Sequence, residues 1–360
     1  MRTVLSVFVV LLVATAAFAP AVAAGSGAAV GTDGASAQQD ADLECEYPLE
    51  LTDATGETVT IDEPPEEIVA LQPSDAQTTY AIGAEAKVVG MPISQYTDYL
   101  EVEDHATDIS QDDGSSVDSE QVIDLEPDVV IAANTALYQE GLIEQLRDEA
   151  GLTVYVVDQA TSIDDVYDNV AVTGQLAGEC EGANDTIEDM KERLDAIEPD
   201  VDEAPTAYYA MGDDGTTAGP GTFNHDVLEA AGLENIAEEA GVEGWGEIDP
   251  ESVVDADPDL IVYPDYQDEP PVPDAVESTA AYQNGNTVAV NDNFMSQPGP
   301  MIVEIVESLA QAAEEQAAEA EEEDETSADG EESEETIPGF GAPVAVAAAL
   351  AAVGALARRR

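Results

Sequence analysis

Side chains that commonly carry out covalent chemistry are sparse in this chain. It contains two histidines, His105 and His225, among 360 residues. It has no G-x-S-x-G nucleophile elbow, no Walker phosphate loop and no zinc-protease histidine pair. Carboxylates are so frequent that no single Asp–Glu pair marks an acid–base dyad. We therefore expect no enzymatic activity, no cofactor and no metal site. We expect His225 to be solvated ahead of a helix, or alternatively to face a ligand.

Aromatic side chains are also scarce, but several share one kind of position. They lie in loops that follow predicted strands, and they are Tyr96, Tyr99, Phe223, Trp245 and Phe294. Such loops are where α/β sheets present ligand sites. Grouped aromatic rings there predict a platform for a large, flat or apolar ligand, although each ring taken singly could instead fill the core of its loop.

An internal repeat indicates the elements that would position these loops. Residues 119–131 match residues 250–262, each reading as a short helix, a Pro-Asp turn and a buried strand. Two similar α/β units are therefore expected, an N-terminal lobe over 42–158 and a C-terminal lobe over 204–312.

Several elements of the first lobe can be placed from local patterns. Residues 49–61 alternate about a glycine turn and predict a β-hairpin. Short buried strands are predicted over 68–71 and 88–91, with a helix over 75–82 between them. The region 159–203 joins the lobes and carries helical apolar stripes over 163–197. We expect Gly178, Gly182 and Asn184 to break it into two helices, the second a rigid connector.

The two ends of the chain predict export and anchoring. Residues 1–24 have the charge, apolar run and small residues of a secretory signal for Sec- or Tat-type export, followed by a polar leader over 25–41. Residues 313–336 form a Glu- and Ala-rich tract that predicts a disordered stalk. Residues 337–360 add a short apolar segment and three arginines, as in a tail anchor whose basic end stays inside the cell.

The charge balance excludes nucleic acid as a partner. Asp and Glu total 80 against 8 Lys and Arg, for a formal net charge of −72. Such a surface repels phosphates. Acidity spread along the whole chain favours a protein that works in concentrated salt, where screening reduces self-repulsion. We infer a halophile, an archaeon. The predicted folded part has four basic residues, Lys87, Arg147, Lys191 and Arg193.

The chain has two cysteines, Cys45 and Cys180, which export would place in an oxidising compartment. A disulfide is favoured, with two free thiols as the alternative. Residues 184–186 form an N-glycosylation sequon of low weight.

Seven segments together resemble the periplasmic binding proteins of ABC importers for cobalamin and iron chelates. These segments are IVALQPS at 68–74, AIG at 81–83, KVVG at 87–90, YTDY at 96–99, LEPDVV at 125–130, FNHDVL at 223–228 and SQPGP at 296–300. The resemblance implies an α/β fold of two Rossmann-like lobes bridged by a long helix, the helical-backbone fold of these proteins. It also implies a monomeric receptor that holds its ligand in the cleft between the lobes.

The same resemblance implies roles for particular residues. The five loop aromatics and Gln72 would line the cleft. Family members of the cobalamin type dock on arginines of the permease through one acidic residue in each lobe. Asp226 matches that position in the second lobe, whereas the first-lobe position falls on Gln77. Either Asp75 substitutes for it, or docking rests on the general negative field of the lobe. The implied partners are an ABC permease and its ATPase.

The nature of the ligand follows from charge. Anionic siderophores need converging Arg or Lys, because a buried unpaired charge is costly. The few basic residues therefore favour a ligand with little negative charge. A corrinoid such as cobalamin is preferred, with a ferric hydroxamate or haem as the alternative. An anchored structural or adhesion protein is the alternative from another class.

The tail resembles the PGF-CTERM segments of archaeal surface proteins. That likeness implies cleavage near Pro338, Gly339 and Phe340 by an archaeosortase and attachment of a lipid. The protein would then work at the outer face of the cell membrane.

Overall fold

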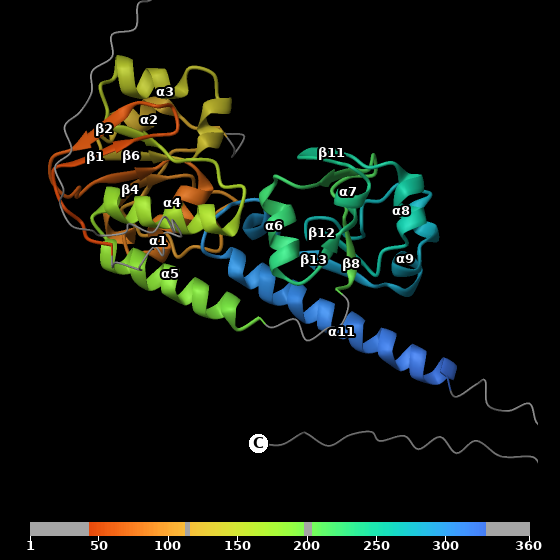
Figure 1. The fold of residues 1–360 in the computed structure, drawn as a ribbon. Coiled ribbons are helices and arrows are strands. Elements are labelled where there is room, and N and C mark those ends of the chain that lie inside the picture. The colour runs from red at the N-terminus through yellow and green to blue at the C-terminus, as the bar shows by residue number, and fades with distance from the viewer. Residues whose placement is uncertain (1–42, 112–115, 198–203, 329–360) are drawn as a thin grey trace, which may run out of the picture. The chain divides into compact units, whose positions relative to one another are not determined.

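A five-stranded parallel sheet forms the N-terminal lobe (Figure 1). The computed structural model describes residues 43–111, 116–197 and 204–328. The strands lie in the order β5-β4-β3-β6-β7. Their bounds are β3 (Ile68–Ala70), β4 (Val88–Met91), β5 (Thr107–Asp108), β6 (Val129–Ala132) and β7 (Val154–Val156). The central strands are continuous apolar runs because helices cover both faces of the sheet. Ile68 and Val69 accordingly enter different buried clusters.

The helices of this lobe are α1 (Pro73–Ala81), α2 (Ser119–Asp124) and α3 (Leu142–Glu144). Shorter turns of helix are η1 (Glu85–Lys87), η2 (Asn134–Tyr138) and η3 (Gln145–Glu149). The predicted hairpin is confirmed as β1 (Leu49–Thr52) paired antiparallel with β2 (Thr58–Ile61). The strands predicted over 68–71 and 88–91 are confirmed as β3 and β4, and the predicted helix as α1.

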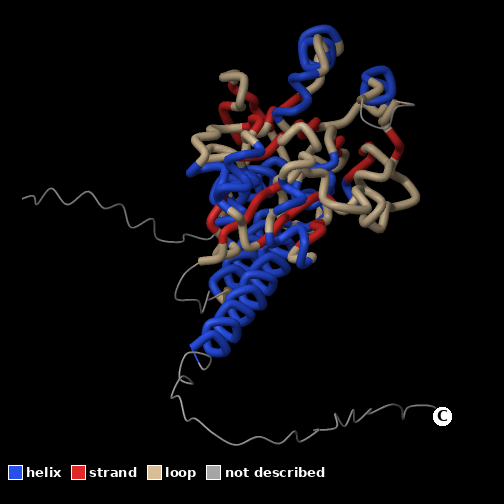
Figure 2. Tube along the Cα trace, turned by 90° about the vertical axis from the view of Figure 1, so that its right-hand side faces the viewer, coloured by secondary structure: helices blue, strands red, loops and turns tan. Residues whose placement is uncertain are grey.

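A four-stranded parallel sheet forms the C-terminal lobe, in the order β10-β8-β12-β13. Helices lie beside the strands of the molecule, as the colouring by secondary structure shows (Figure 2). Its strands are β8 (Thr206–Tyr209), β10 (Glu234–Asn235), β12 (Leu260–Pro264) and β13 (Thr287–Val290), and β9 (Thr216–Ala218) pairs antiparallel with β11 (Trp245–Glu247). The helices are α6 (Phe223–Ala230), α7 (Ile236–Glu239), α8 (Pro250–Ala256), η4 (Val276–Ser278), α9 (Ala280–Asn284) and α10 (Asp292–Met295).

The predicted repeat is confirmed, and the structure explains its Pro-Asp pair. The first copy forms α2 and β6, and the second forms α8 and β12. In each copy the aspartate after the proline caps the chain that enters the neighbouring strand. The Asp128 carboxylate accepts from the Glu66 and Glu67 N–H groups ahead of β3. The Asp259 carboxylate accepts from the N–H and hydroxyl of Thr206, the first residue of β8. The Pro-Asp spacing that the two copies share therefore helps to set the position of the neighbouring strand.

Two helices follow the N-terminal sheet, α4 (Ile163–Ala177) and α5 (Cys180–Asp195), separated at Gly178. Gly178 has φ 71°, the left-handed conformation of a helix C-cap. The prediction that Gly182 and Asn184 also break the helix is wrong, because both lie inside α5. A side chain at Gly182 would strike the Ile82 carbonyl oxygen, at 1.9 Å from an ideal Cβ, so glycine here permits close packing of α5 on the end of α1.

Asn184 ties the start of the described chain to α5. Its Oδ1 accepts from the Leu43 N–H and its Nδ2 donates to the Leu43 carbonyl. An amide committed to both backbone groups is not presented to a glycosylating enzyme, which counts against use of the sequon. The favoured disulfide is present, joining Cys45 to Cys180 beside this contact.

The last helix, α11 (Ile302–Ala328), packs against α5, α6, α10 and β13. It continues past residue 313, so the expectation of a disordered stalk over 313–336 is wrong up to Ala328. An unbroken run of Ala, Glu and Gln suits a helix, since these residues have high helix propensity. Among the helices of the described residues, none has the length and apolarity needed to cross a membrane. The predicted signal, leader and tail lie outside the described residues.

Candidate ligand-binding cleft

Loops from both lobes enclose a cleft of about 400 Å³. From the N-terminal lobe come the loops that follow β3, β6 and β7, together with one face of α4. From the C-terminal lobe come the end of β8, the start of α6, the start of β11 and the loop after α10. The lining residues are Gln72, Pro73, Ser74, Asp75, Thr78, Ala133, Asn134, Thr135, Tyr138, Val157, Asp158, Gln159, Ala160, Asn169, Thr173, Tyr209, Met211, Gly221, Thr222, Phe223, Asn224, Gly244, Trp245, Ser296, Gln297 and Pro298.

Strand order explains why the cleft forms at this edge of the N-terminal sheet. From β3 the chain winds through α1 to β4, whereas from β6 it winds through α3 to β7 on the opposite side. The connections therefore diverge between β3 and β6. In open α/β sheets the crevice at such a switch point, outside the carboxyl ends of the strands, is where ligands bind.

Asp75 joins the two diverging strands at this point. It is the third residue of α1, and its Oδ2 accepts from the Gln72 N–H at 2.9 Å and from the Ala133 N–H at 2.8 Å. Its side chain is 5% exposed. Burial raises the pKa of Asp75 to about 7, although the two N–H groups act in the opposite direction. A carboxyl group on the cleft wall thus titrates near neutral pH.

Phe223, Asn224 and Tyr209 build the opposite wall. Thr222 caps α6 by accepting from the His225 N–H through its hydroxyl, which places Phe223 and Asn224 on the first turn. Asn224 is held by donating from Nδ2 to the Met295 carbonyl at 3.0 Å. Phe223 and Tyr209 are buried and belong to the lining of the cleft.

Two exposed aromatic side chains flank the cleft, one from each lobe. Trp245 is 55% exposed and Tyr138, in η2, is 80% exposed. Pairing of Trp245 with Ala218 across β11 and β9 fixes the tryptophan loop. Gly219 permits the backbone at Val242 to lie close to the end of β9, because a Cβ on residue 219 would lie 1.9 Å from the Val242 carbonyl oxygen. The sequence analysis did not single out Tyr138, although Gly141 follows it in the same loop.

The predicted site residues divide into two groups. Gln72, Phe223 and Trp245 line the cleft. The prediction that Tyr96, Tyr99 and Phe294 line it as well differs from the structure. Tyr99 and Phe294 instead pack edge to face, with ring centroids 5.0 Å apart, where the two lobes meet.

A hydrogen-bonded chain across the lobes explains the position of Tyr99. The Tyr99 hydroxyl accepts from Gln77 Nε2 and donates to Gln297 Oε1, both at 3.0 Å. The chain continues at both ends, since Gln77 Oε1 accepts from the Met301 N–H and Gln297 Nε2 donates to the Tyr96 carbonyl. Because Gln297 also lines the cleft, this chain fixes the cleft wall to the contact between the lobes.

Removal of the Tyr99 hydroxyl is expected to destabilise the protein. The variant Y99F leaves a donor on Gln77 and an acceptor on Gln297 buried without their partner, at a cost of about 2 kcal/mol. Urea unfolding measures this change. Y96F is the matched control, because Tyr96 joins the chain through its backbone carbonyl, and we expect a change under about 0.5 kcal/mol. Equal stability of Y99F and wild type would contradict the role given to this chain.

The predicted docking residues are not free surface groups. Asp75 and Gln77 are buried, at 5% and 1% exposed. Asp226 Oδ2 accepts from the N–H of Ile163, the first residue of α4, at 2.7 Å and so joins α6 to that helix. The burial of Asp75 and Gln77 counts against a docking role for either, and a docking role for Asp226 would compete with its helix contact.

The basic side chains of the described residues are engaged away from the cleft. Lys87 donates to the Ala177 carbonyl and pairs with Glu179, at the end of α4. Arg147 pairs with Asp53 and Glu57. Arg193 pairs with Glu307 and Asp189, and Lys191 lies over the Tyr167 ring. Among the residues that line the cleft, none is Lys, Arg or His.

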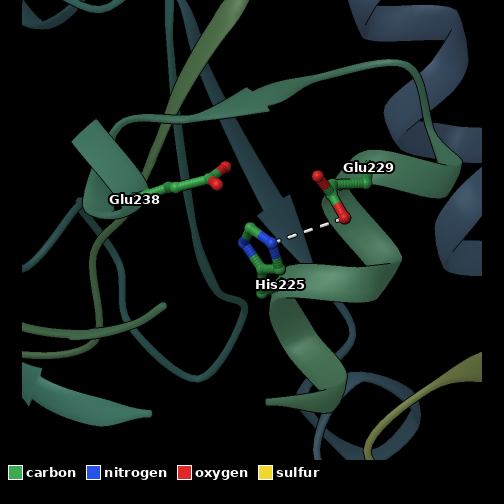
Figure 3. A group of neighbouring side chains, drawn as sticks. All are labelled: His225, Glu229 and Glu238. Atoms are coloured by element: carbon green, nitrogen blue, oxygen red, sulfur yellow. Dashed lines mark ion pairs between the residues drawn. The ribbon is translucent and has the colours of Figure 1, made fainter. Parts of the chain in front are cut away.

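His225 is buried, at 7% exposed, rather than solvated as expected. It points towards Glu229 and Glu238, and the ligand atoms of the three lie within 4.8 Å of one another (Figure 3). Asn235 fixes the tautomer. Its Oδ1 accepts from the Ala237 N–H and its Nδ2 donates to the Ala218 carbonyl, so the amide group facing His225 Nδ1 is a donor.

Nδ1 of His225 is therefore an acceptor and Nε2 carries the hydrogen, and Nε2 lies 3.4 Å from Glu229 Oε2. A metal ion would need the lone pair of Nε2. His225 therefore pairs with Glu229 beside Glu238, and its tautomer does not suit a metal ion.

Two lobes with parallel sheets, and a cleft lined by loops of both, define a protein that holds its ligand between lobes. The chain belongs to the periplasmic binding protein family, whose model matches residues 68–295. The predicted α/β fold is thereby confirmed.

Particular relatives can be named. A cobalamin-binding protein of Halobacterium salinarum is 38% identical over 286 residues, which cover 76% of this chain and 76% of the relative. An uncharacterized ABC transporter substrate-binding lipoprotein of Bacillus subtilis, YvrC, is 30% identical over 277 residues, 74% of this chain and 85% of the relative. Among solved structures, a possible iron-binding periplasmic solute-binding protein of Staphylococcus epidermidis matches with a TM-score of 0.60 at 24% identity, covering 69% of this chain and 99% of that one. This last likeness concerns the fold.

Proposed function

We propose that the protein is the receptor of an ABC importer and captures cobalamin in its cleft. The observation that carries this proposal is the chemical character of the cleft, which combines aromatic side chains with amides, hydroxyls and two carboxyl groups and has no cationic side chain. The cobalamin-binding relative of Halobacterium salinarum supports the same ligand, and the substrate-binding relative of Bacillus subtilis supports the importer role.

The absence of a cation from the cleft lining argues against anionic ligands. A catecholate siderophore, or haem with its propionates, would bring negative charge beside Asp75 and Asp158 with no Lys or Arg to compensate. A corrin ring with amide side chains matches aromatic surface and neutral hydrogen-bonding groups. A neutral ferric hydroxamate meets the same charge criterion and is the alternative to test.

Truncation of Trp245 should weaken cobalamin binding. An exposed tryptophan at the rim of a cleft is typical of binding hot spots, and its loss should raise the Kd for cyanocobalamin about 30-fold. Isothermal calorimetry on W245A measures the change. Y266A is the matched control, since Tyr266 is a 62% exposed aromatic outside the cleft lining and its truncation should leave the Kd within about 2-fold.

Titration of the wild-type protein separates the candidate functions. Cyanocobalamin should quench the fluorescence of Trp245, the single tryptophan of the chain, and release heat at micromolar concentration. Binding of ferric hydroxamates with no response to cyanocobalamin would replace the corrinoid by the alternative ligand. No response to either would favour a structural or adhesion role.

Anchoring at the outer face of the membrane is part of the proposal. The acidic tract, the short apolar segment and the terminal arginines support it, with archaeosortase cleavage near Pro338, Gly339 and Phe340. Tethering would keep the loaded receptor at high effective concentration beside the permease and its ATPase. Mass spectrometry of the mature C-terminus is the test, and an intact Arg358 to Arg360 end would exclude cleavage.

A further inference from the structure

Asp75 is the one fully enclosed carboxyl group at the switch point of the N-terminal sheet, among the described residues that line the cleft. Asp158, the other carboxylate of the lining, is exposed. The position of Asp75 is fixed by two backbone N–H groups, one from each of the diverging strand ends. A side chain held in this way cannot swing out to solvent, so its polarity acts on whatever occupies the cleft.

Both of these hydrogen bonds go to the same oxygen of the Asp75 carboxyl group. Both N–H groups of Gln72 and Ala133 point at Oδ2. A carboxyl group can bond through both of its oxygens, so Oδ1 is the atom through which Asp75 would meet a ligand. An ionised carboxylate accepts hydrogen bonds and cannot donate them, which makes it a partner for N–H donors and a repellent for carboxylates.

On the basis of the proposed function, we propose that Asp75 is a specificity-determining residue of the cleft. Its carboxylate binds an amide N–H of the ligand and rejects a ligand that carries a carboxylate at the same place. Peripheral amides of a corrinoid supply the donor, and hydrolysis of one amide to the acid converts the accepted ligand into the rejected one.

Few titratable side chains lie near Asp75, so a change in ligand preference between two pH values can be assigned to its carboxyl group. Helix α1 packs on β3, β4, α4 and α5. Strands β3 and β4 contain no titratable side chain. From α4 the lining residues are Asn169 and Thr173, and α5 contributes none. The other titratable side chains of the described lining are Asp158, Tyr138 and Tyr209. Burial raises the pKa of Asp75 to about 7, so between pH 5.5 and pH 8.5 its charge changes.

The test compares two ligands, cyanocobalamin and its monocarboxylic acids, in which one peripheral amide is hydrolysed. At pH 8.5 the wild-type protein should bind the amide at least about tenfold more tightly than the most affected acid isomer, since a like charge at close range costs at least that factor. In D75N this preference should fall below about 3-fold. D124N, which removes the same charge from an exposed position outside the cleft lining, should keep the preference of the wild type.

A second measurement needs no variant. At pH 5.5, where the Asp75 carboxyl is protonated, the wild-type protein should lose most of its preference for the amide, and D75N should show the same preference at both pH values. Retention of the full preference by D75N, or a preference independent of pH in the wild type, would overturn this inference while leaving cobalamin binding intact. A wild-type protein that does not bind cyanocobalamin would overturn the proposed function and this inference together.

Discussion

Replacement of both bridged cysteines, in the variant C45S/C180S, should lower the free energy of unfolding by about 4 to 5 kcal/mol. The bridge joins residues 135 positions apart. In the chain-entropy model a cross-link over so long a segment removes much of the freedom of the unfolded chain, and the stabilisation grows with loop length. That amount is a large fraction of the total stability of a domain. Urea unfolding of the variant and of the reduced wild type should give the same loss.

The control separates the cross-link from the contacts beside it. Asn184 ties Leu43 to α5 with two hydrogen bonds, so N184A loosens the same attachment and leaves the covalent bridge in place. We expect it to cost about 1 kcal/mol. If C45S/C180S lost no more stability than N184A, the disulfide would be holding the N-terminal segment locally without restricting the unfolded chain.

Elements specified by neighbouring residues could be predicted from the sequence. The hairpin over 49–61 follows from alternation and a glycine turn, and its pairing of Leu49 with Ile61 is set locally. The repeat was visible because Pro and Asp recur at the same spacing. The role of its two aspartates could not be predicted, because the N–H groups that Asp128 and Asp259 accept from lie more than fifty residues away in the sequence. The helix at 313–328 was missed because an acidic composition was given more weight than helix propensity.

The residues of the candidate site could likewise be predicted only in part. Trp245 and Phe223 were predicted because glycine-rich loops mark them, and both line the cleft. Tyr99 was predicted because its loop follows a predicted strand, but its hydroxyl is bonded to Gln77 and Gln297, and Gln297 lies 198 residues along the chain. No pattern in a single sequence reports such a pairing. Asp75 was assigned to a docking surface because sequence position does not reveal the direction of a side chain at a helix start.

The cost of burying the Asp75 charge leads to the last prediction. The variant D75N should be more stable than the wild type above neutral pH. An asparagine Oδ1 can still accept from the N–H groups of Gln72 and Ala133, so the cap is kept while the buried charge is removed. The folded-state pKa is raised to about 7 from an ordinary value near 3.8. Between pH 3.8 and about pH 7 the folded protein therefore binds more protons than the unfolded chain. The free energy of unfolding of the wild type accordingly falls as the pH rises through that interval.

At pH 8 the difference between D75N and wild type should reach up to about 4 kcal/mol, and near pH 4 it should vanish. Chemical denaturation of both proteins across this range gives the difference directly. The control is D158N, which changes an exposed side chain and should alter the stability at pH 8 by less than about 0.5 kcal/mol. A constant difference between D75N and wild type would mean that Asp75 is not the group that titrates. A carboxylate that costs stability and yet stands on the wall of the cleft is explained by what it does to the ligand, because an asparagine would serve the helix cap equally well.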